Sequence, residues 1–383
     1  MKYLFVLGRN VELSVAEIKS FLEREGIKFK VISIVKNGIL IETERILRGI
    51  VDQLGGTISI GEVLAEGDVK EIMEKLDSKS LYNVKGNKLN YAVFDFNGKD
   101  SGRILFYLKN RFRKEGLKAT EKKLTGRISL QSGEKVSKVS SNLIDEQYFL
   151  FEKSFGRIIE ETDYEKIEKR DMGKPVRRSE LSISPRLAKI LINLSKVKQG
   201  EILLDPFCGI GTILQEALLQ NVKVIGVDKD RKAIDCSELN LKWFNFNKEN
   251  YTLINGDSSI IKILEVDGIA TEPDLGELQK RMPSEEKAKE ITKNFEKLMS
   301  NVLKNLKKYV RQKAEPLANS SLKSQVKGRI VFTAPLIQTE NKRIPCNFDS
   351  IRLRAGLRIV KGFPINEFRE NSIVGRTIVV MEK

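Results

Sequence analysis

The stretch that decides the fold reads ILLDPFCGIGT and spans residues 202–212. A short apolar strand runs into a turn that contains Gly209 and Gly211, and an apolar segment with helical character, 213–219, follows. Glycine lets the backbone approach a ligand closely, and a helix N-terminus favours negative groups. The pattern therefore predicts the first strand, turn and helix of a doubly wound sheet, with room for a carboxylate and a ribose.

Acidic residues also end the next two predicted strands. Asp228 follows the strand 223–227, and Asp257 comes shortly after the strand 251–255. An acid about 20 residues after a glycine turn suits ribose hydroxyls, and Asp257 could accept a hydrogen bond from an adenine amino group. One such acid is often a helix cap, but three successive strand ends that carry acids, Asp205 included, favour a ligand site. The missing third glycine of G-x-G-x-x-G argues against a dinucleotide.

Composition limits the chemistry that the chain can perform. Its 383 residues include 68 Lys and Arg against 52 Asp and Glu, a net charge of +16, and no histidine. The absence of histidine excludes His-based triads and His general bases, and no metal site is expected. The positive excess favours a polyanionic partner, although a lysine-rich proteome would give the same balance. Three distant cysteines and the lack of a long apolar run predict a cytoplasmic protein without membrane segments.

The N-terminal 160 residues predict two α+β modules. The first, 1–65, has an Asn-Gly hairpin signal and a capping-box pattern, Ser14 with Glu17; its expected strands are 3–7, 30–35, 38–42 and 57–63, and its expected helices 14–23 and 45–54. The second module, 66–160, has expected strands 89–96, 148–151 and 156–160 and an expected helix 102–115.

One basic segment lies inside the second module. Residues 99–138 contain twelve Lys or Arg and four Asp or Glu. Charged runs usually form solvated surface, but this one is interleaved with Gly, Ser and Thr, which favours contact with RNA.

A change of pattern marks the C-terminal half of the chain. Residues 161–183 are polar, charged and predicted as a linker, and from 184 to 383 helices alternate with apolar strands, which predicts a parallel sheet. The expected strands are 201–204, 223–227, 251–255, 268–271, 329–333, 357–361 and 377–381, and residues 304–327 are predicted as a basic helix end and a loop.

The glycine turn carries a family resemblance. DPFCGIGT, residues 205–212, resembles the cofactor motif of methyltransferases that modify exocyclic amino groups of nucleic-acid bases. KRDMGKPVR at 169–177 and SPRLA at 184–188 are similar to the lead-in of the tRNA guanine-10 N2-methyltransferase family. The opening at 3–17 resembles the start of that family, and SSNL at 140–143 resembles the end of its THUMP domain. The resemblance covers nearly the whole chain.

The resemblance implies an α/β fold in three parts: a ferredoxin-like domain over 1–65, a THUMP-like RNA-binding domain over 66–160, and a Rossmann-like seven-stranded methyltransferase domain over 184–383. It also implies S-adenosylmethionine as cofactor and tRNA as partner. The candidate cofactor-binding residues are Ser184, Pro185, Asp205, Pro206, Phe207, Cys208, Gly209, Gly211, Thr212, Asp228, Lys229, Asp257 and Ser258.

The chain departs from the family where the reaction should occur. The family places Asp or Asn, two prolines and an aromatic residue after the fourth strand, whereas this chain has Glu272, Pro273, Asp274 and Leu275. An exocyclic amine is a poor nucleophile, and carboxylate and carbonyl acceptors can orient it and take up developing charge. We therefore predict Glu272, Pro273 and Asp274 as catalytic residues, with the loss of a stacking ring worth about 1–3 kcal/mol per base.

These features predict a tRNA methyltransferase that acts on guanine N2, of the position-10 type. Two alternatives stay open. A catalytically silent tRNA-binding paralogue would explain Asp274 and Leu275, and a DNA amino-methyltransferase would use the same cofactor motif, although the N-terminal modules argue against it. The sequence leaves open the modified nucleotide, mono- or dimethylation, a small activator subunit and the oligomeric state.

Overall fold

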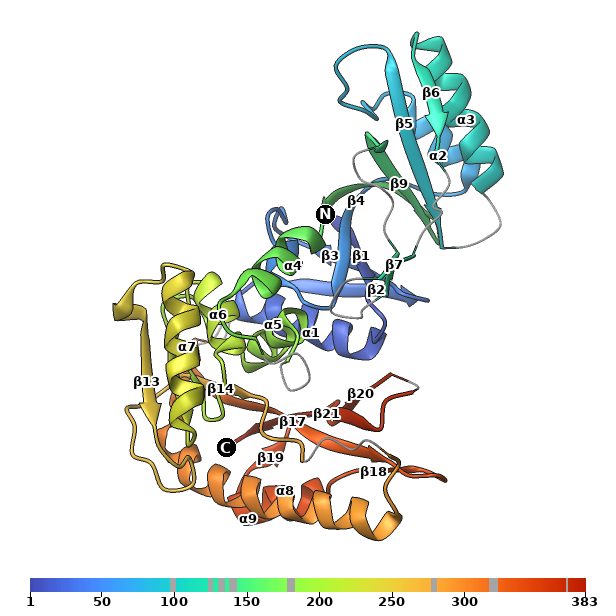
Figure 1. Cartoon of the computed structure of the whole chain (residues 1–383). Helices are drawn as coiled ribbons and strands as arrows, with labels where there is room; N and C mark the ends of the chain where they lie inside the picture. Colours follow the sequence, from blue (N-terminus) through green and yellow to red (C-terminus); the bar gives the residue numbers. More distant parts are fainter. Residues whose placement is uncertain are drawn as a thin grey trace. The chain divides into compact units, whose positions relative to one another are not determined.

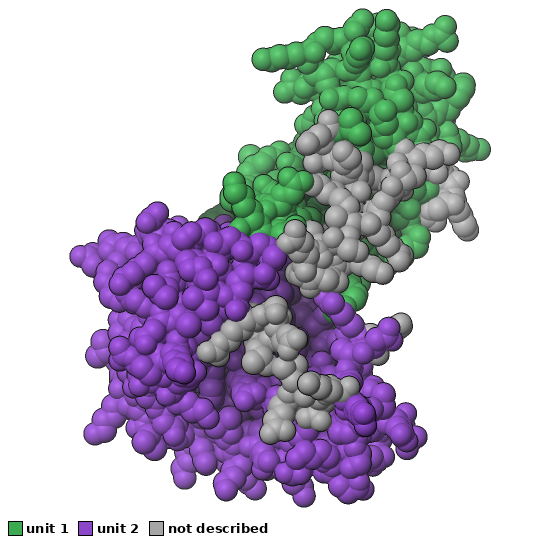
Figure 2. All heavy atoms as spheres, viewed as in Figure 1, with its two compact units in different colours: residues 1–11, 27–52, 56–169 green, residues 12–26, 53–55, 170–383 purple. Residues whose placement is uncertain are grey.

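The computed structural model (Figure 1) divides into two compact units (Figure 2). Unit 1 comprises residues 1–11, 27–52 and 56–169, and unit 2 comprises residues 12–26, 53–55 and 170–383. The structure describes residues 1–96, 101–122, 127–129, 135–137, 143–177, 183–276, 281–316, 323–369 and 371–383. Most of the SSNL stretch, part of the basic segment and residues 317–322 of the predicted loop lie outside these ranges.

Unit 1 is built on one eight-stranded sheet. Its order is β2 (Phe29–Val35), β3 (Gly38–Thr43), β1 (Lys2–Leu7), β4 (Thr57–Glu66), β10 (Ser154–Glu161), β9 (Glu146–Phe151), β5 (Lys88–Asp95) and β6 (Lys118–Glu121). β5 runs parallel to β6 and β9, and the other pairs are antiparallel. Because β4 pairs with β1 and with β10, both predicted N-terminal modules contribute strands to the same sheet.

An aromatic core fills the second half of this sheet. Helices α2 (Val69–Leu76) and α3 (Ser101–Lys114) cover it, and Phe112 of α3 lies against Tyr91 and Tyr148. The Tyr148 hydroxyl donates to the carbonyl of Leu81 at 2.6 Å, which satisfies the one polar atom of a fully buried side chain. Phe112 therefore ties α3 to the strands, while the opposite face of α3 stays exposed.

Two predicted features of the first module are wrong. α1 spans Val11–Arg24, so Ser14 and Glu17 lie inside the helix and form no capping box. Residues 45–54 form no helix beyond a single 3-10 turn at Val51–Gln53, because the amides of Ile50 and Val51 donate to the Glu160 carboxylate at 3.0 and 2.9 Å instead of to helical carbonyls.

Helix α1 belongs to unit 2 although it follows β1 in sequence. The Glu17 carboxylate is fully buried and accepts hydrogen bonds from the Gly55 amide and the Asn193 side chain, both at 2.7 Å. Asn193 lies on α5 (Pro185–Ser195), so a buried polar network fixes α1 against that helix.

Unit 2 contains a sheet with a path of seven strands. The order is β13 (Tyr251–Asn255), β12 (Lys223–Asp228), β11 (Ile202–Asp205), β14 (Gly268–Thr271), β17 (Arg329–Gln338), β21 (Val374–Glu382) and β19 (Arg358–Ile359). The first five strands are parallel, and β21 is antiparallel to both its neighbours. Two short strands, β18 (Arg343–Ile344) and β20 (Ile365–Glu367), pair with β17 and β21. All the strands predicted for this half are confirmed.

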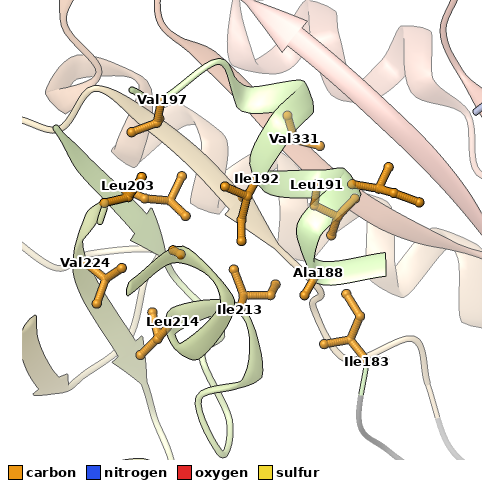
Figure 3. Packing of buried hydrophobic residues seen from close by; sticks show 14 of the residues in the cluster. Ile183, Ala188, Leu191, Ile192, Val197, Leu203, Ile213, Leu214, Val224 and Val331 are labelled. Carbon is orange, nitrogen blue, oxygen red and sulfur yellow. The ribbon is translucent and has the colours of Figure 1, made fainter. Parts of the chain in front are cut away.

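Alternating side chains bury both faces of this sheet. Leu203 and Val331 pack with α5, α6 (Thr212–Leu219) and α7 (Arg231–Trp243), as Figure 3 shows for part of the cluster. Their neighbours Leu204 and Ile330 pack with α8 (Glu285–Leu306) and α9 (Phe348–Ala355). Burial on both faces explains the continuous apolar runs that predicted parallel strands.

The predicted linker and the predicted loop contain regular structure, and α8 supplies the predicted helix end up to Leu306. Residues 161–183 include α4 (Tyr164–Gly173), and residues 304–327 include an antiparallel pair of strands, β15 (Gln312–Pro316) and β16 (Lys323–Lys327). Another short pair, β7 (Arg127–Ser129) and β8 (Lys135–Ser137), lies within the basic segment of unit 1. In the described ranges, no helix is long and apolar enough to cross a membrane.

Candidate functional site

The predicted glycine turn joins β11 to α6. Gly209 and Gly211 have φ angles of 51° and 87°, values that favour glycine. A Cβ on Gly211 would lie 2.5 Å from the Ser237 hydroxyl, whereas a Cβ on Gly209 would meet no atom within 4 Å. Gly211 therefore allows α7 to pack closely, while the backbone at Gly209 borders open space in which a ligand could lie.

Asp228, at the end of β12, is hydrogen-bonded to this turn. One carboxylate oxygen accepts the Gly209 amide and the other accepts the Asp230 amide, both at 2.9 Å. The side chain is half-buried. Each oxygen of an ionised carboxylate has about two lone-pair sites, so each keeps a position for a further donor such as a ribose hydroxyl.

Asp205 lies deeper, at the end of β11. It is buried and accepts hydrogen bonds from the Thr271 hydroxyl at 2.6 Å and from the Phe207 amide at 3.1 Å. Burial raises the pKa of Asp205 to about 7, against the two hydrogen bonds, which act to lower it. The Asp205 side chain therefore joins the ends of β11 and β14 and is not exposed at the surface.

Asp257 and Ser258 follow β13. Asp257 is exposed and accepts hydrogen bonds from the Ser259 hydroxyl and amide at 2.7 and 2.8 Å, and these bonds lower its pKa. The buried Ser258 hydroxyl donates to the Pro206 carbonyl at 2.6 Å. Asp257 thus caps its own turn, as the alternative interpretation of a single acid allowed, and Ser258 ties that turn to the glycine turn.

The other predicted cofactor residues have mixed surroundings. Cys208 is buried, which raises the pKa of its thiol, and its amide donates to Val227 at 2.9 Å. Ser184 caps α5 by accepting the Leu187 amide at 3.2 Å, with Pro185 as the first helical residue. Phe207 is half-buried and packs on the α8 side, Thr212 is buried at the start of α6, and Lys229 is exposed.

Sequence reasoning missed the residues that hold the turn from outside. The Asn240 side-chain amide on α7 donates to the carbonyl of Ile210 at 2.9 Å and to that of Val176 at 3.1 Å. Lys174 is buried, with its ammonium 2.7 Å from Asp171 and 3.4 Å from the Thr212 hydroxyl. The resemblance at 169–177 marked this segment, but no local pattern linked it to α6 and α7.

The three predicted catalytic residues, which follow β14 directly, have different surroundings. The Glu272 carboxylate forms an ion pair with Arg376, at 2.6 Å from Nε and 3.2 Å from Nη2, and accepts the Thr333 hydroxyl at 3.3 Å. Pro273 is buried. Asp274 is exposed and accepts the Gly276 amide at 3.0 Å. Burial alone would lower the pKa of Arg376, but Glu272 raises it.

Leu275, which replaces the aromatic residue of the family motif, is half-buried and packs against the α8 side of the sheet. It therefore belongs in part to the core. Within the described ranges, no group of three or more His, Cys, Asp or Glu side chains could hold a metal ion.

A hollow of about 500 Å³ lies away from this site. It is placed where β11, β12 and β13 begin, and its lining includes Gly200, Lys223 and Asn250. Ligands of open α/β sheets bind at the carboxyl ends of the strands, so this hollow is separate from the candidate site.

The fold and the site define a class of protein. Residues 174–336 match the family of RMKL-like methyltransferase domains, and residues 78–239 match a DNA methylase family. The crystal structure of TrmN from Thermus thermophilus aligns over 100% of both chains, with a TM-score of 0.51 and 14% sequence identity. The chain is therefore a mixed α/β protein with two large sheets and a methyltransferase fold.

Closer relatives are archaeal. The tRNA (guanine(10)-N2)-dimethyltransferase of Methanothermobacter thermautotrophicus is 41% identical over 96 residues, which are 25% of this chain and 28% of that protein. The enzyme of the same name from Methanocaldococcus jannaschii is 30% identical over 201 residues, 49% of this chain and 56% of that protein. The chain thus matches about half or less of the length of these relatives. It is related to the tRNA guanine-10 N2-dimethyltransferase family, which confirms the resemblance predicted from the motifs.

Asp205 gives a testable dependence of stability on pH. Its pKa is about 7 in the folded chain and ordinarily 3.8. Between these values the folded state binds a proton that the unfolded state has lost, so the free energy of unfolding falls as the pH rises from about 4 to 7, by up to about 4 kcal/mol. Asp205→Asn should remove this part of the fall in urea unfolding series from pH 4 to 8.

The control for this experiment is Asp230→Asn, because Asp230 caps α7 in an exposed position and asparagine caps equally well. It should keep the pH dependence of the parent. Identical pH dependence in the parent and Asp205→Asn would show that Asp205 does not carry the proton.

Proposed function

We propose that this chain transfers a methyl group from S-adenosylmethionine to an exocyclic amine of a tRNA base, guanine N2 of the position-10 type. The observation that carries the proposal is the edge of the second sheet, where the Gly209 turn with Asp228 and the Glu272 carboxylate follow neighbouring parallel strands. The sequence relatives that bear this activity in their names support it.

The residues around the turn fit the proposed cofactor. The open space beside Gly209 and the N-terminus of α6 suit a carboxylate. Asp228 retains acceptor positions for ribose hydroxyls, and the exposed Asp257 carboxylate could accept a hydrogen bond from the adenine amino group. The cofactor would supply an electrophilic methyl group, and the protein would contribute chiefly proximity and orientation.

The chain after β14 fits the substrate amine. Glu272 offers a fixed carboxylate, and the backbone carbonyls beside the buried Pro273 offer a second acceptor. Two acceptors can orient an amine and stabilise the positive charge that develops on it. The exposed Asp274 is a further acceptor within reach of solvent.

The N-terminal unit fits an RNA-binding role. In this proposal its first and second halves are the ferredoxin-like and THUMP-like parts of one continuous sheet. On α3, Ile104, Leu108 and Phe112 are fully buried, whereas Phe106 is 69% exposed. Lys109 and Arg113 are exposed at helical spacing from Phe106. Cations beside an exposed ring suit phosphates and a stacked base.

Two alternatives have specific support. The DNA methylase family that matches residues 78–239 favours a DNA amino-methyltransferase. The ion pair on Glu272 and the packed Leu275 favour a silent tRNA-binding paralogue, because both differ from a free acid beside a stacking ring.

The cofactor assignment predicts the effect of Asp228→Ala. This substitution removes the acceptor for ribose and releases the Gly209 amide, so affinity for S-adenosylhomocysteine should fall at least about tenfold in calorimetry. Asp235→Ala, which removes an exposed carboxylate of α7 that pairs with Arg231, is the matched control and should bind like the parent. Equal affinity of Asp228→Ala and the parent would remove Asp228 from the cofactor site.

The α3 surface predicts how full-length variants bind tRNA. Lys109→Ala with Arg113→Ala should weaken binding and reduce the slope of log affinity against log salt by about 0.7–0.9 per lost phosphate contact. Phe106→Ala should weaken binding and leave the slope unchanged, because stacking releases no counterions. Lys19→Ala, an exposed lysine of α1, is the charge control. Parent-like binding by both α3 variants would place the RNA elsewhere.

The activity itself is tested with labelled S-adenosylmethionine and separate tRNA, rRNA and DNA. We expect transfer to unmodified tRNA alone, a fall of about 10²-fold or more in Glu272→Ala, and a smaller fall in Asp274→Ala. Transfer to DNA would favour the DNA amino-methyltransferase. A parent that binds cofactor and tRNA but methylates nothing would favour the silent paralogue, and undiminished transfer by Glu272→Ala would place the chemistry on another residue.

A further inference from the structure

Three adjacent strands bring side chains to the Glu272 carboxylate. Glu272 follows β14, Thr333 lies on β17, and Arg376 lies on β21. The register of the strands explains this convergence. Thr271 is opposite Phe332, so the next residues, Glu272 and Thr333, are level with each other. Thr333 is in turn opposite Ile378, which is two residues from Arg376 on β21. The position of the carboxylate is thus set by the sheet itself.

The hydrogen bonds on Glu272 use most of its accepting capacity. Oε1 receives the Arg376 Nε–H at 2.6 Å and the Thr333 hydroxyl at 3.3 Å, and Oε2 receives an Arg376 Nη2–H at 3.2 Å. Since a carboxylate has about four lone-pair sites, one remains, on Oε2. The Glu272 side chain is only 10% exposed, so that single position faces a restricted space.

We propose that Arg376 is a positioning residue: its guanidinium fixes the Glu272 carboxylate so that the remaining acceptor site on Oε2 is presented to the amine of the substrate base. This inference rests on the proposed function. A two-pronged contact from Nε and Nη2 fixes both the place and the plane of a carboxylate, which a single hydrogen bond cannot do. In a chain that lacks the aromatic ring of the family motif, this fixed acceptor takes over part of the orientation of the base.

The chemistry of arginine makes the role specific. A lysine at 376 would keep the charge but donate from one point, so it would hold Glu272 without fixing its plane. Among the described residues, two other acidic groups act on the pair: Glu367 on β20 acts on Arg376, and the buried Asp205 at the end of β11 interacts with Glu272. In the described ranges, Arg376 is the cation that forms an ion pair with Glu272.

The experiment is a double-mutant cycle of Arg376→Gln and Glu272→Gln, measured for methyl transfer to tRNA. Arg376→Gln should lower kcat by about tenfold or more, as expected when an acceptor is misplaced, with KM for tRNA within about twofold of the parent. Arg376→Lys should restore part of kcat. In the Glu272→Gln background, Arg376→Gln should change kcat by less than about twofold, because the residue acts through Glu272.

Arg358→Gln is the matched control. Arg358 pairs with Glu382 in the same sheet, away from this edge, so its loss should leave kcat within about twofold of the parent. Equal losses of kcat in Arg358→Gln and Arg376→Gln would reduce the role of Arg376 to general stability and overturn the proposal. So would additive losses of kcat in the cycle, which would mean that Arg376 acts independently of Glu272.

Thermal unfolding of the same proteins without RNA separates this inference from the proposed function. The losses in Tm of the two single variants should be non-additive, since both break one ion pair. Additive losses in Tm would overturn the pairing whatever the activity. The losses in Tm can be non-additive in a parent protein that methylates no RNA. In that case the proposed function fails, and so does the role of Arg376 toward a substrate. The ion pair between Arg376 and Glu272 would then be purely structural.

Discussion

The Asp228 carboxylate accepts the Gly209 amide, and this hydrogen bond joins the end of β12 to the turn that leaves β11. Gly209 has a φ of 51°, and a Cβ there would meet no atom within 4 Å. The second oxygen of Asp228 holds the Asp230 amide at the start of α7. One side chain therefore sets the positions of two helix starts, and the order of the surrounding edge depends on it.

Around this bond, other polar groups tie the loops of the edge together. Ser258 holds the Pro206 carbonyl, and Asn240 holds the Ile210 carbonyl from α7. Asp205 and Thr271 join the first and fourth strands in sequence order beneath the surface. Buried polar groups of this kind are costly when unpaired and rigid when paired. A rigid edge suits a reaction whose rate depends chiefly on placement.

The predictions from sequence succeed where the information is local. The glycine turn and the strands of unit 2 follow from short apolar runs, glycine positions and acids at strand ends. The predictions fail where a distant partner decides. Glu17 matched a capping box, yet it is buried against Asn193, and the predicted helix over 45–54 is lost because Glu160 takes the amides of Ile50 and Val51. Arg376 lies 104 positions from Glu272, so no spacing could connect them.

The three strand-end acids do not support the proposed function equally. Asp205 is buried on Thr271 and Asp257 caps its own turn, so their presence would be explained in a protein without a cofactor. Asp228 and Glu272 differ, because each binds other parts of the protein and still keeps an accepting position: Asp228 is half-buried and the Glu272 side chain is 10% exposed. Asp228 and Glu272 are therefore the two carboxylates on which the proposed function depends, because their unfilled accepting positions would have to receive a ribose hydroxyl and a base amine.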